Sequence, residues 1–277
     1  MNPVDGWPAL AAARNADPST RTTFCIGGRP AGSVARAHLD VLRAWPALLR
    51  VSDSGVDLQV PLAQRDSALR QMNTSLREQG LIRAWRDEIF SVPDLQTDQT
   101  LAAMERAAAR FWGTLTLGAH ANGYLADAAG RPTHLWVAQR AEHKATDAGL
   151  FDNLIGGGVA QGQSPFEALV REGGEEAGLA PTLVGTARAG SVIRLHRSVA
   201  EGFQLEELHC FDLCLPPSCV PRNIDGEVQN FRCWPVKEAL ALAAGTSMTV
   251  DAALVSLDFA VRHGLLAAPA GWAALLR

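Results

Sequence analysis

Residues 171–179 read Arg171-Glu172-Gly173-Gly174-Glu175-Glu176-Ala177-Gly178-Leu179 and follow a run of glycines at 156–158. Upstream, Ser164-Pro165-Phe166-Glu167 marks the start of a helix. Serine at the N-cap, proline in the first turn and glutamate three residues after the serine together form a capping box. Gly178 is placed to end this helix. Because positions three and four apart share a helix face, the pattern predicts that Glu172, Glu175 and Glu176 project together.

Three like charges on one helix face are unfavourable unless a cation lies between them. Hard carboxylate oxygens suit Mg²⁺ or Mn²⁺, which keep waters and bridge to substrate phosphates. A solvated acidic face is the ordinary alternative. Gly173 and Gly174 argue against it, because each costs roughly 1 kcal/mol relative to alanine and such local conflicts mark functional sites or close packing. We therefore expect Glu172, Glu175 and Glu176 to be metal ligands.

The stretch from Gly157 to Leu179 resembles the Nudix box, G-x5-E-x7-R-E-U-x-E-E-x-G-U, in which U is a bulky aliphatic residue. Seven of nine specified positions match in register: Gly157, Arg171, Glu172, Glu175, Glu176, Gly178 and Leu179. Gln163 stands where the box has its first glutamate, and Gly173 replaces an aliphatic residue. The resemblance implies a Nudix α/β/α sandwich with a mixed sheet, in which a loop–helix–loop binds divalent metal for pyrophosphate hydrolysis.

The resemblance also implies roles for the motif residues. Glu172, Glu175 and Glu176 carry the metal in the family, and Glu175 or Glu176 could take the proton of the attacking water. Arg171 is the motif arginine, which the absent first glutamate usually helps to fix. Glu167 precedes Arg171 by four residues, so we expect it to form the substitute ion pair along the helix.

Composition bounds the remaining possibilities. The chain has 277 residues, with 25 basic against 29 acidic side chains and a net charge of −4, so no basic footprint indicates a nucleic-acid partner. No apolar run approaches the ~20 residues that cross a bilayer, which predicts no membrane association. Five cysteines, without a Cys-x-x-Cys pair or an apolar signal segment, predict a reducing cytoplasm. Cys210, Cys214 and Cys219 could in principle bind zinc, but their spacing favours buried reduced thiols.

A change of character near residues 108–116 predicts two domains, a smaller N-terminal α+β domain at 1–112 and an α/β (α+β) domain at 113–277. In the first domain we expect helices at 34–45, 64–79 and 97–110 and strands at 58–61 and 89–92. In the second, strands and helices interleave, with strands at 206–215 and 228–233 and closing helices at 235–243 and 251–263.

Several segments outside the box resemble the thiamine-diphosphate-type branch of the Nudix hydrolases, the proteins related to the hydrolase part of fungal thiamine pyrophosphokinase. The likeness spans roughly residues 24–263, including the N-terminal domain. These segments are Gly80–Glu88, Glu105–Ala108, His120–Tyr124, Phe151–Leu154 and Asp225–Val228. The resemblance implies cleavage of a small organic diphosphate, with thiamine diphosphate or its oxidised oxo and oxy analogues favoured and the monophosphate as product.

Candidate substrate-binding residues lie on both sides of the box, namely Gly157, Gly158, Arg140, Lys144, Trp85, Tyr124 and Glu227. Arg140 and Lys144 could meet phosphate, or be solvated loop charges. Trp85, beside Arg86 and Glu88, could contact a thiazolium through a cation–π interaction, or be a core tryptophan next to a surface ion pair.

Alternation along a strand places Tyr124 on one face with His120 and Asn122, toward substrate or in an ordinary packed face. Glu227 is either a site residue, including a candidate base, or an exposed residue at the start of a strand. Glu206 and Glu207 fall in an alternating strand, so one is expected to face inward and the other outward.

Two other functions remain open at this point. A nucleoside diphosphate derivative such as ADP-ribose or NADH could be the substrate, since the chemistry is shared and only the pocket differs. A catalytically silent Nudix fold could instead act as a ligand sensor, although the carboxylates that such a protein would lose are present. The sequence is also compatible with a homodimer.

Overall fold

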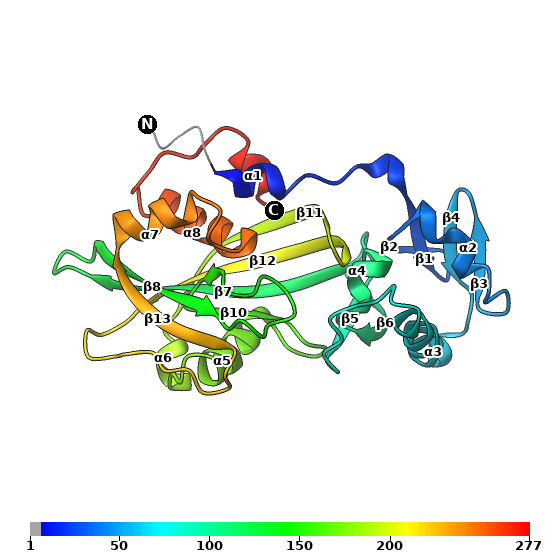
Figure 1. The fold of residues 1–277 in the computed structure, drawn as a ribbon, viewed down its shortest axis with the longest axis horizontal. Helices are drawn as coiled ribbons and strands as arrows, with labels where there is room; N and C mark the ends of the chain where they lie inside the picture. The colour runs from blue at the N-terminus through cyan, green and yellow to red at the C-terminus, as the bar shows by residue number, and fades with distance from the viewer. Residues whose placement is uncertain (1–6) are drawn as a thin grey trace.

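The computed structural model describes residues 7–277, which form two parts lying side by side (Figure 1). The small part comprises residues 21–112. The large part comprises residues 113–277 together with α1 (Pro8–Ala12), because Trp7, Ala9 and Ala13 share a hydrophobic core with α8 (Val250–Arg262). Residues 13–20 therefore cross from the large part to the small one. Within residues 7–277, no helix is long and apolar enough to cross a membrane.

The small part is built on a four-stranded sheet of order β2-β1-β4-β3, in which β1 and β4 run parallel. Its strands are β1 (Arg21–Ile26), β2 (Arg29–Ala35), β3 (Leu49–Ser52) and β4 (Gly55–Leu58). A hairpin of β5 (Ile89–Pro93) and β6 (Thr100–Glu105) follows α3 (Arg65–Glu78). The helix α4 (Ala108–Trp112) inserts Trp112 against Phe24, with ring centroids 4.5 Å apart.

Two expected helices of the small part are wrong. The segment expected as a helix at 34–45 begins in β2 and contains only the short turn Arg36–His38 and α2 (Leu39–Leu42). Most of the one expected at 97–110 is β6, whose residues Leu101–Glu105 are all buried. Alanine-rich sequence favours helix locally, but pairing with β5 and burial override that weak preference. The strand expected at 58–61 ends at Leu58, whereas β5 and α3 are confirmed.

A seven-stranded mixed sheet forms the middle of the large part, with β11-β12-β7-β8-β13 in order, β10 beside β7 and β9 beside β8. Its long central strands, β7 (Leu115–Ala126) and β12 (Gly202–Cys214), run parallel. The others are β8 (Pro132–Arg140), β9 (Phe151–Asp152), β10 (Ile155–Gly158), β11 (Arg188–Val199) and β13 (Val228–Pro235).

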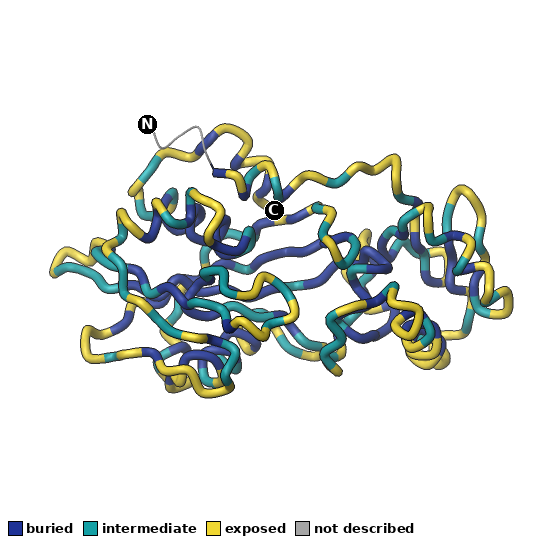
Figure 2. The backbone as a smooth tube through the Cα atoms, in the orientation of Figure 1, coloured by how far each residue is buried: buried dark blue, intermediate teal, exposed yellow. Residues whose placement is uncertain are grey.

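Helices cover both faces of this sheet (Figure 1). On one face, α5 (Pro165–Glu175) and α6 (Pro181–Val184) pack through Leu169 and Val184; on the other lie α7 (Val236–Ala243), α8 and α1. Figure 2 shows the central strands as a buried layer between the exposed outer sides of the helices. The mixed α/β sandwich with an added N-terminal part confirms the expected fold class.

The structure confirms the helix start that the sequence predicts at Ser164. The Ser164 hydroxyl accepts a hydrogen bond from the Glu167 amide at 3.2 Å, and the Ser164 amide donates to the Glu167 carboxylate at 2.8 Å. Gly178 follows the helix with φ of +63°, a backbone conformation that glycine adopts without strain. The motif helix is thus fixed at both ends, which orients its glutamates relative to β10.

Candidate active site

A cavity of about 320 Å³ lies between the two parts. Its floor is formed by α5, β7, β10 and β12 of the large part, and the small part closes it with the hairpin β5–β6 and α4. The lining is strongly charged: the basic side chains are Arg83, Arg86, Arg106, Arg110, Arg140, Lys144 and Arg197, and the acidic ones are Asp147, Asp152, Glu172, Glu176, Glu201, Glu206, Glu227 and Asp251.

Two of the three motif glutamates reach this cavity. Glu172 and Glu176 line it and are only 9% and 7% exposed. Burial raises the pKa of Glu172, and burial together with the charges of Glu172 and Asp152 raises the pKa of Glu176 well above its usual value. Glu175 does not line the cavity, and its side chain is 52% exposed. The predicted grouping of all three is therefore only partly present.

Arg171 explains where Glu175 points. One guanidinium nitrogen donates to Glu175 at 2.8 Å, and the other donates to Glu172 at 2.8 Å and to the Gly158 carbonyl at 3.3 Å. The expected pair between Glu167 and Arg171 is absent, which corrects that prediction. Glu167 is instead held by Ser164 in the capping box, where its carboxylate satisfies an otherwise free amide.

The glycines of β10 allow close contact on three sides. A Cβ on Gly157 would lie 2.2 Å from the Glu172 carboxyl carbon, and one on Gly156 would lie 2.8 Å from His120. A Cβ on Gly158 would lie 2.5 Å from Phe90 and 3.0 Å from the Arg106 guanidinium carbon, both in the small part. Gly156 and Gly157 line the cavity, whereas Gly158 lies against the small part instead.

The donor set fits a divalent metal ion of the kind expected. No group of three or more His, Cys, Asp or Glu side chains within residues 7–277 is arranged to hold a metal by itself. Glu172 and Glu176 nevertheless provide two buried carboxylates whose mutual repulsion a cation would relieve. Mg²⁺ commonly takes one or two carboxylates and completes its shell with waters and substrate phosphates. Two protein carboxylates therefore suffice for that mode of binding.

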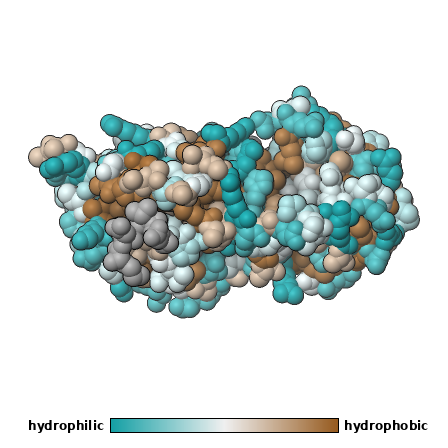
Figure 3. Space-filling model, turned by 90° about the horizontal axis from the view of Figure 1, so that it is seen from above, coloured by the Kyte–Doolittle hydropathy of each residue, from teal (hydrophilic) through white to brown (hydrophobic). Residues whose placement is uncertain are grey.

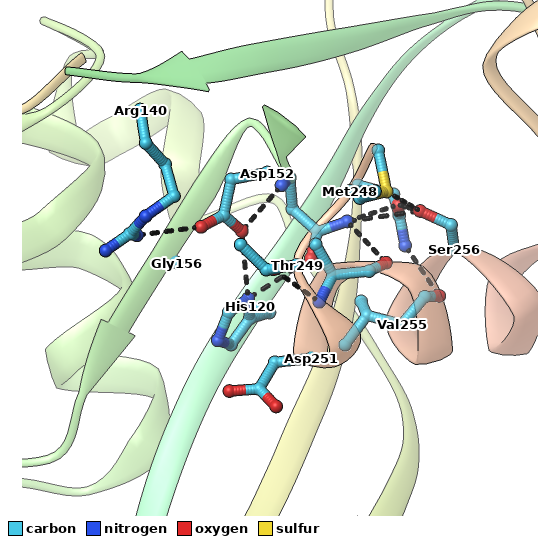
Figure 4. Close-up of polar contacts among 12 residues, drawn as sticks. His120, Arg140, Asp152, Gly156, Met248, Thr249, Asp251, Val255 and Ser256 are labelled. Atoms are coloured by element: carbon cyan, nitrogen blue, oxygen red, sulfur yellow. Dashed lines mark hydrogen bonds and ion pairs between the residues drawn. The ribbon is translucent and has the colours of Figure 1, made fainter. Parts of the chain in front are cut away.

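Asp152 connects the metal side of the cavity to its basic side. Arg140 donates to Asp152 at 3.0 Å, and the His120 imidazole Nδ1 lies 3.8 Å from the other Asp152 oxygen (Figure 4). His120 is itself held by Asn153 at 3.1 Å, and Asn153 donates to Asn122 at 3.1 Å. Asp251 points toward His120 from the start of α8 (Figure 4). Arg140 is thus held in place at the cavity wall.

Lys144 and Glu227 form an ion pair at the rim, and both line the cavity. Burial alone would raise the pKa of Glu227, but the hydrogen bond and charge of Lys144 outweigh it and lower the pKa. Arg86 lies near them and has no carboxylate within ion-pair distance among residues 7–277. Burial, with the charge of Arg106, lowers the pKa of Arg86, so an anion bound beside it would stabilise its charge.

An acidic wall, formed by Glu206 and Asp251, lines the same cavity. The Gln204 amide donates to Glu206 at 2.6 Å and to Asp251 at 3.2 Å, so it bridges the two carboxyl groups. Arg110 donates to Glu206 at 3.2 Å. Burial and the charge of Glu206 raise the pKa of Asp251. The sequence singles out Glu206, and Arg106 only as part of the segment 105–108. It gives no sign of Arg110, Gln204 or Asp251 as site residues, because no local motif marks them.

Three predicted substrate-binding residues lie outside the cavity lining, namely Gly158, Trp85 and Tyr124. The Trp85 indole donates to Asp87 at 2.8 Å, and its ring lies 4.7 Å below the Arg77 guanidinium. Tyr124 shares its strand face with His120 and Asn122, but four residues of β7 carry it beyond the cavity. There it packs against Phe259 and His263 in the core under α8, with ring centroids 5.4 and 5.5 Å away. Of the two alternatives left open by the sequence, Tyr124 therefore lies in a packed face of the sheet and not toward the substrate.

The cysteines are all free thiols. Cys210 is buried as expected for a strand thiol, and burial raises its pKa well above the usual value. Cys214 is exposed and Cys219 is partly buried, so only one of the three clustered cysteines matches the expected buried state.

Comparisons with known proteins agree with this geometry. The profile of a NUDIX domain matches residues 117–251, and that of a domain of unknown function, DUF4743, matches residues 9–116. The chain is 35% identical over 249 residues to Nudix hydrolase 24, chloroplastic, of Arabidopsis thaliana, which covers 88% of this chain and 68% of that protein. Nudix hydrolase 20, chloroplastic, of the same plant is 33% identical over 256 residues, with the same coverage.

Among solved structures, DR0079 from Deinococcus radiodurans aligns with 62% of this chain and 99% of its own, at 20% identity and a TM-score of 0.46. That likeness is too distant to add to the argument. The identities to the two plant proteins extend over both parts of the molecule. The acidic helix and the cavity-lining residues from His120 to Asp251 lie within the NUDIX match, and the lining residues from Arg83 to Thr116 lie within the DUF4743 match. This chain belongs to the Nudix hydrolase family, and it is a hydrolase acting on pyrophosphate bonds.

Proposed function

We propose that this protein hydrolyses the phosphoanhydride bond of a small organic diphosphate with the help of Mg²⁺ or Mn²⁺. The observation that carries the proposal is the pair Glu172 and Glu176, two buried carboxylates side by side at the floor of a cavity whose rim carries cations. Carboxylates with raised pKa values at such a place are typical of a functional site.

Glu172 and Glu176 would hold the metal, and Glu175 could join them by leaving Arg171. When bound, the ion offsets the charge that develops on the phosphate oxygens and on the attacking water. Arg171 positions Glu172 through their hydrogen bond and ties it to the Gly158 carbonyl. Glu175, Glu176 and Glu227 are the candidate acceptors of the water's proton; of these, Glu227 is committed to Lys144.

Arg86, Arg140 and Lys144 would bind the diphosphate. Arg140 and Lys144 already have carboxylate partners in Asp152 and Glu227. Arg86 has none within residues 7–277, so it gains most from a phosphate oxygen. A guanidinium can contact two oxygens of a phosphate at once, which orients the group for attack from one side.

For the organic part we propose thiamine diphosphate or an oxidised analogue. Supporting this, Asp251 lines the cavity beside Glu206, and burial together with the charge of Glu206 raises the pKa of Asp251. Burial would raise the pKa of Glu206 as well, but Arg110 and the Gln204 hydrogen bond outweigh it and lower the pKa. A positively charged ring beside Asp251 would favour the charged form of that carboxyl group. A nucleoside diphosphate derivative such as ADP-ribose is the alternative. Its base would stack on an aromatic side chain, but the only Phe, Tyr or Trp in the described lining is Phe90, whose ring is already covered by the Arg106 guanidinium.

The test is a substrate panel with purified protein and Mg²⁺ or Mn²⁺: thiamine diphosphate, its oxo and oxy analogues, ADP-ribose and NADH, with release of phosphate or monophosphate followed over time. We expect turnover on a thiamine compound to exceed that on the nucleotides. Glu172→Gln, Glu175→Gln and Glu176→Gln should each lower turnover by at least about a hundredfold. Glu78→Gln, an exposed residue on α3, is the control and should have no effect.

Mn²⁺ binding, measured by electron paramagnetic resonance without substrate, separates loss of metal from loss of chemistry. Full turnover in Glu172→Gln and Glu176→Gln would contradict the site. Normal Mn²⁺ binding with no turnover on any compound would favour the catalytically silent ligand sensor instead.

We also propose the division into an N-terminal domain at 1–112 and a Nudix domain at 113–277, with α1 packed on the second. Arg86→Met should then raise the KM for the diphosphate while leaving Mn²⁺ binding unchanged, because Arg86 belongs to the small part. A cytoplasmic location and a homodimer stay predictions of the sequence.

A further inference from the structure

A second cavity, of about 790 Å³, lies at the waist between the two parts, away from the acidic helix. We call it the waist groove and define it by its six basic residues, which are Arg14, Arg21, Arg36, Arg194, His196 and Arg277. It is bounded by β1 and β2 on one side and by β11 and the last residues of the chain on the other. In the view from above, hydrophilic side chains gather at this waist (Figure 3).

The described lining of the waist groove contains no Asp or Glu side chain. Behind it, Glu207 accepts hydrogen bonds from Arg194 at 3.0 Å and from Arg277 at 2.6 Å, so one fully buried negative charge serves two guanidinium groups. Arg277 has a further, exposed partner in Asp98 at 3.3 Å. The remaining arginines of the lining, Arg14, Arg21 and Arg36, have no carboxylate partner among residues 7–277.

Arg21 is held by Ser33 and lies 4.5 Å above the Phe203 ring, with no carboxylate partner among residues 7–277. Burial lowers the pKa of Arg21 to about 10. Arg36 donates to the backbone carbonyls of Ser19 and Asp53, and the exposed Arg14 has no side-chain partner within the described chain. Burial and the charges of Arg194 and Arg14 lower the pKa of His196, as expected of a positive surface.

We propose that the waist groove is a second ligand site, which binds an oligophosphate anion, either an inorganic oligophosphate or the phosphate chain of a nucleotide. Guanidinium groups pair with phosphate oxygens through two parallel hydrogen bonds. Hydroxyl donors stand among the arginines at Thr22, Thr23, Ser33 and Ser54. The volume falls within the range of about 300–1,000 Å³ that is typical of small-molecule pockets. Neither the proposed catalytic roles nor the metal requires these residues.

The test measures binding of tripolyphosphate, ATP and orthophosphate to the full chain by calorimetry, with a chelator present so that the metal-dependent site does not contribute through an ion. We expect tripolyphosphate to bind more tightly than orthophosphate. The double variant Arg14→Ser/Arg36→Ser should weaken that binding by about tenfold or more, as two charge-assisted contacts are lost. Hydrolysis of the diphosphate substrate by this variant should stay within about twofold of the original protein.

A matched control removes two exposed arginines elsewhere, in Arg70→Ser/Arg222→Ser, and should bind tripolyphosphate normally. If the variant Arg14→Ser/Arg36→Ser does not fold, the experiment uses Arg14→Glu instead, because Arg14 is exposed and makes no side-chain hydrogen bond within the described residues. Equal ATP and tripolyphosphate affinities indicate recognition of the phosphates alone, and tighter ATP binding indicates a nucleotide; both support the site. The proposal would be overturned if the groove variants bound tripolyphosphate normally, or if the control lost as much affinity as they did. It would also be overturned if the protein bound single-stranded RNA but not tripolyphosphate.

Discussion

Glu206 and Glu207 are neighbours on β12 whose carboxylates point to opposite faces of the sheet, each toward a different cavity. Glu206 meets Arg110 and Gln204 at the active-site wall, and Glu207 meets Arg194 and Arg277 behind the waist groove. Successive side chains of a strand alternate in this way. A single dipeptide therefore places one buried carboxylate in the lining of the active-site cavity and the other behind the lining of the waist groove, and each is paired with arginines from other elements.

The pair of Arg110 with Glu206 joins the two parts of the molecule. Arg110→Met should lower the free energy of unfolding by about 2 kcal/mol, because a buried carboxylate loses its cation while Gln204 and Arg106 remain near it. The double variant Arg110→Met/Glu206→Gln should recover at least half of that loss. Urea unfolding measures the free energy of unfolding of the single variant, of the double variant and of the surface comparison Arg50→Met. Equal losses in the single and double variants would contradict the pairing of Arg110 with Glu206.

Gly157 gives Glu172 the room it occupies. In Gly157→Ala the new methyl group would lie 2.2 Å from the Glu172 carboxyl carbon, so the carboxylate must move. We expect turnover and Mn²⁺ affinity to fall together by about tenfold or more, in line with changes that displace a metal ligand. Steady-state kinetics and Mn²⁺ titration test this. Normal values for both would show that Glu172 does not depend on this close approach.

The two adjacent glycines of α5 should respond oppositely to alanine. A Cβ on Gly173 would lie 2.8 Å from Val184 and 3.0 Å from Ile155, so Gly173→Ala overpacks the core and should destabilise the protein by roughly 1–3 kcal/mol. A Cβ on Gly174 has its nearest neighbour at 3.9 Å, so Gly174→Ala should stabilise it by roughly 0.5–1 kcal/mol. Denaturant unfolding compares them, and the same sign in both would refute the distinction.

His38 should make stability depend on pH. Burial and the charge of Arg21 lower the pKa of His38, so the folded protein binds this proton less tightly than the unfolded chain. The resulting stability is fully present above the ordinary histidine value of about 6.5 and is lost as the pH falls below it. Between pH 7.5 and 5.5, His38→Gln should therefore lose less unfolding free energy than the original protein. A parallel decline in both would rule out this source.

What the sequence predicts well is local. The capping box at Ser164 and the stop at Gly178 depend on neighbouring residues, and both are present as expected. The prediction fails where distant segments decide, as in β6, which is a strand because β5 pairs with it. It also fails where two local contacts compete, since Glu167 bonds Ser164 rather than Arg171. Arg106 and Arg110 reach the cavity only through the packing of one part on the other, which no short motif records.

The contact of Gly158 with Phe90 and Arg106 has a consequence for how this protein can change over generations. The backbone of β10 presses on the small part where any side chain at Gly158 would collide. Substitutions in the β5–β6 hairpin are therefore restricted by the glycines of β10, and substitutions of those glycines are restricted by the hairpin. We expect the two parts to be inherited as a matched set, because a foreign N-terminal part grafted onto this hydrolase would not be shaped to the bare backbone at Gly158.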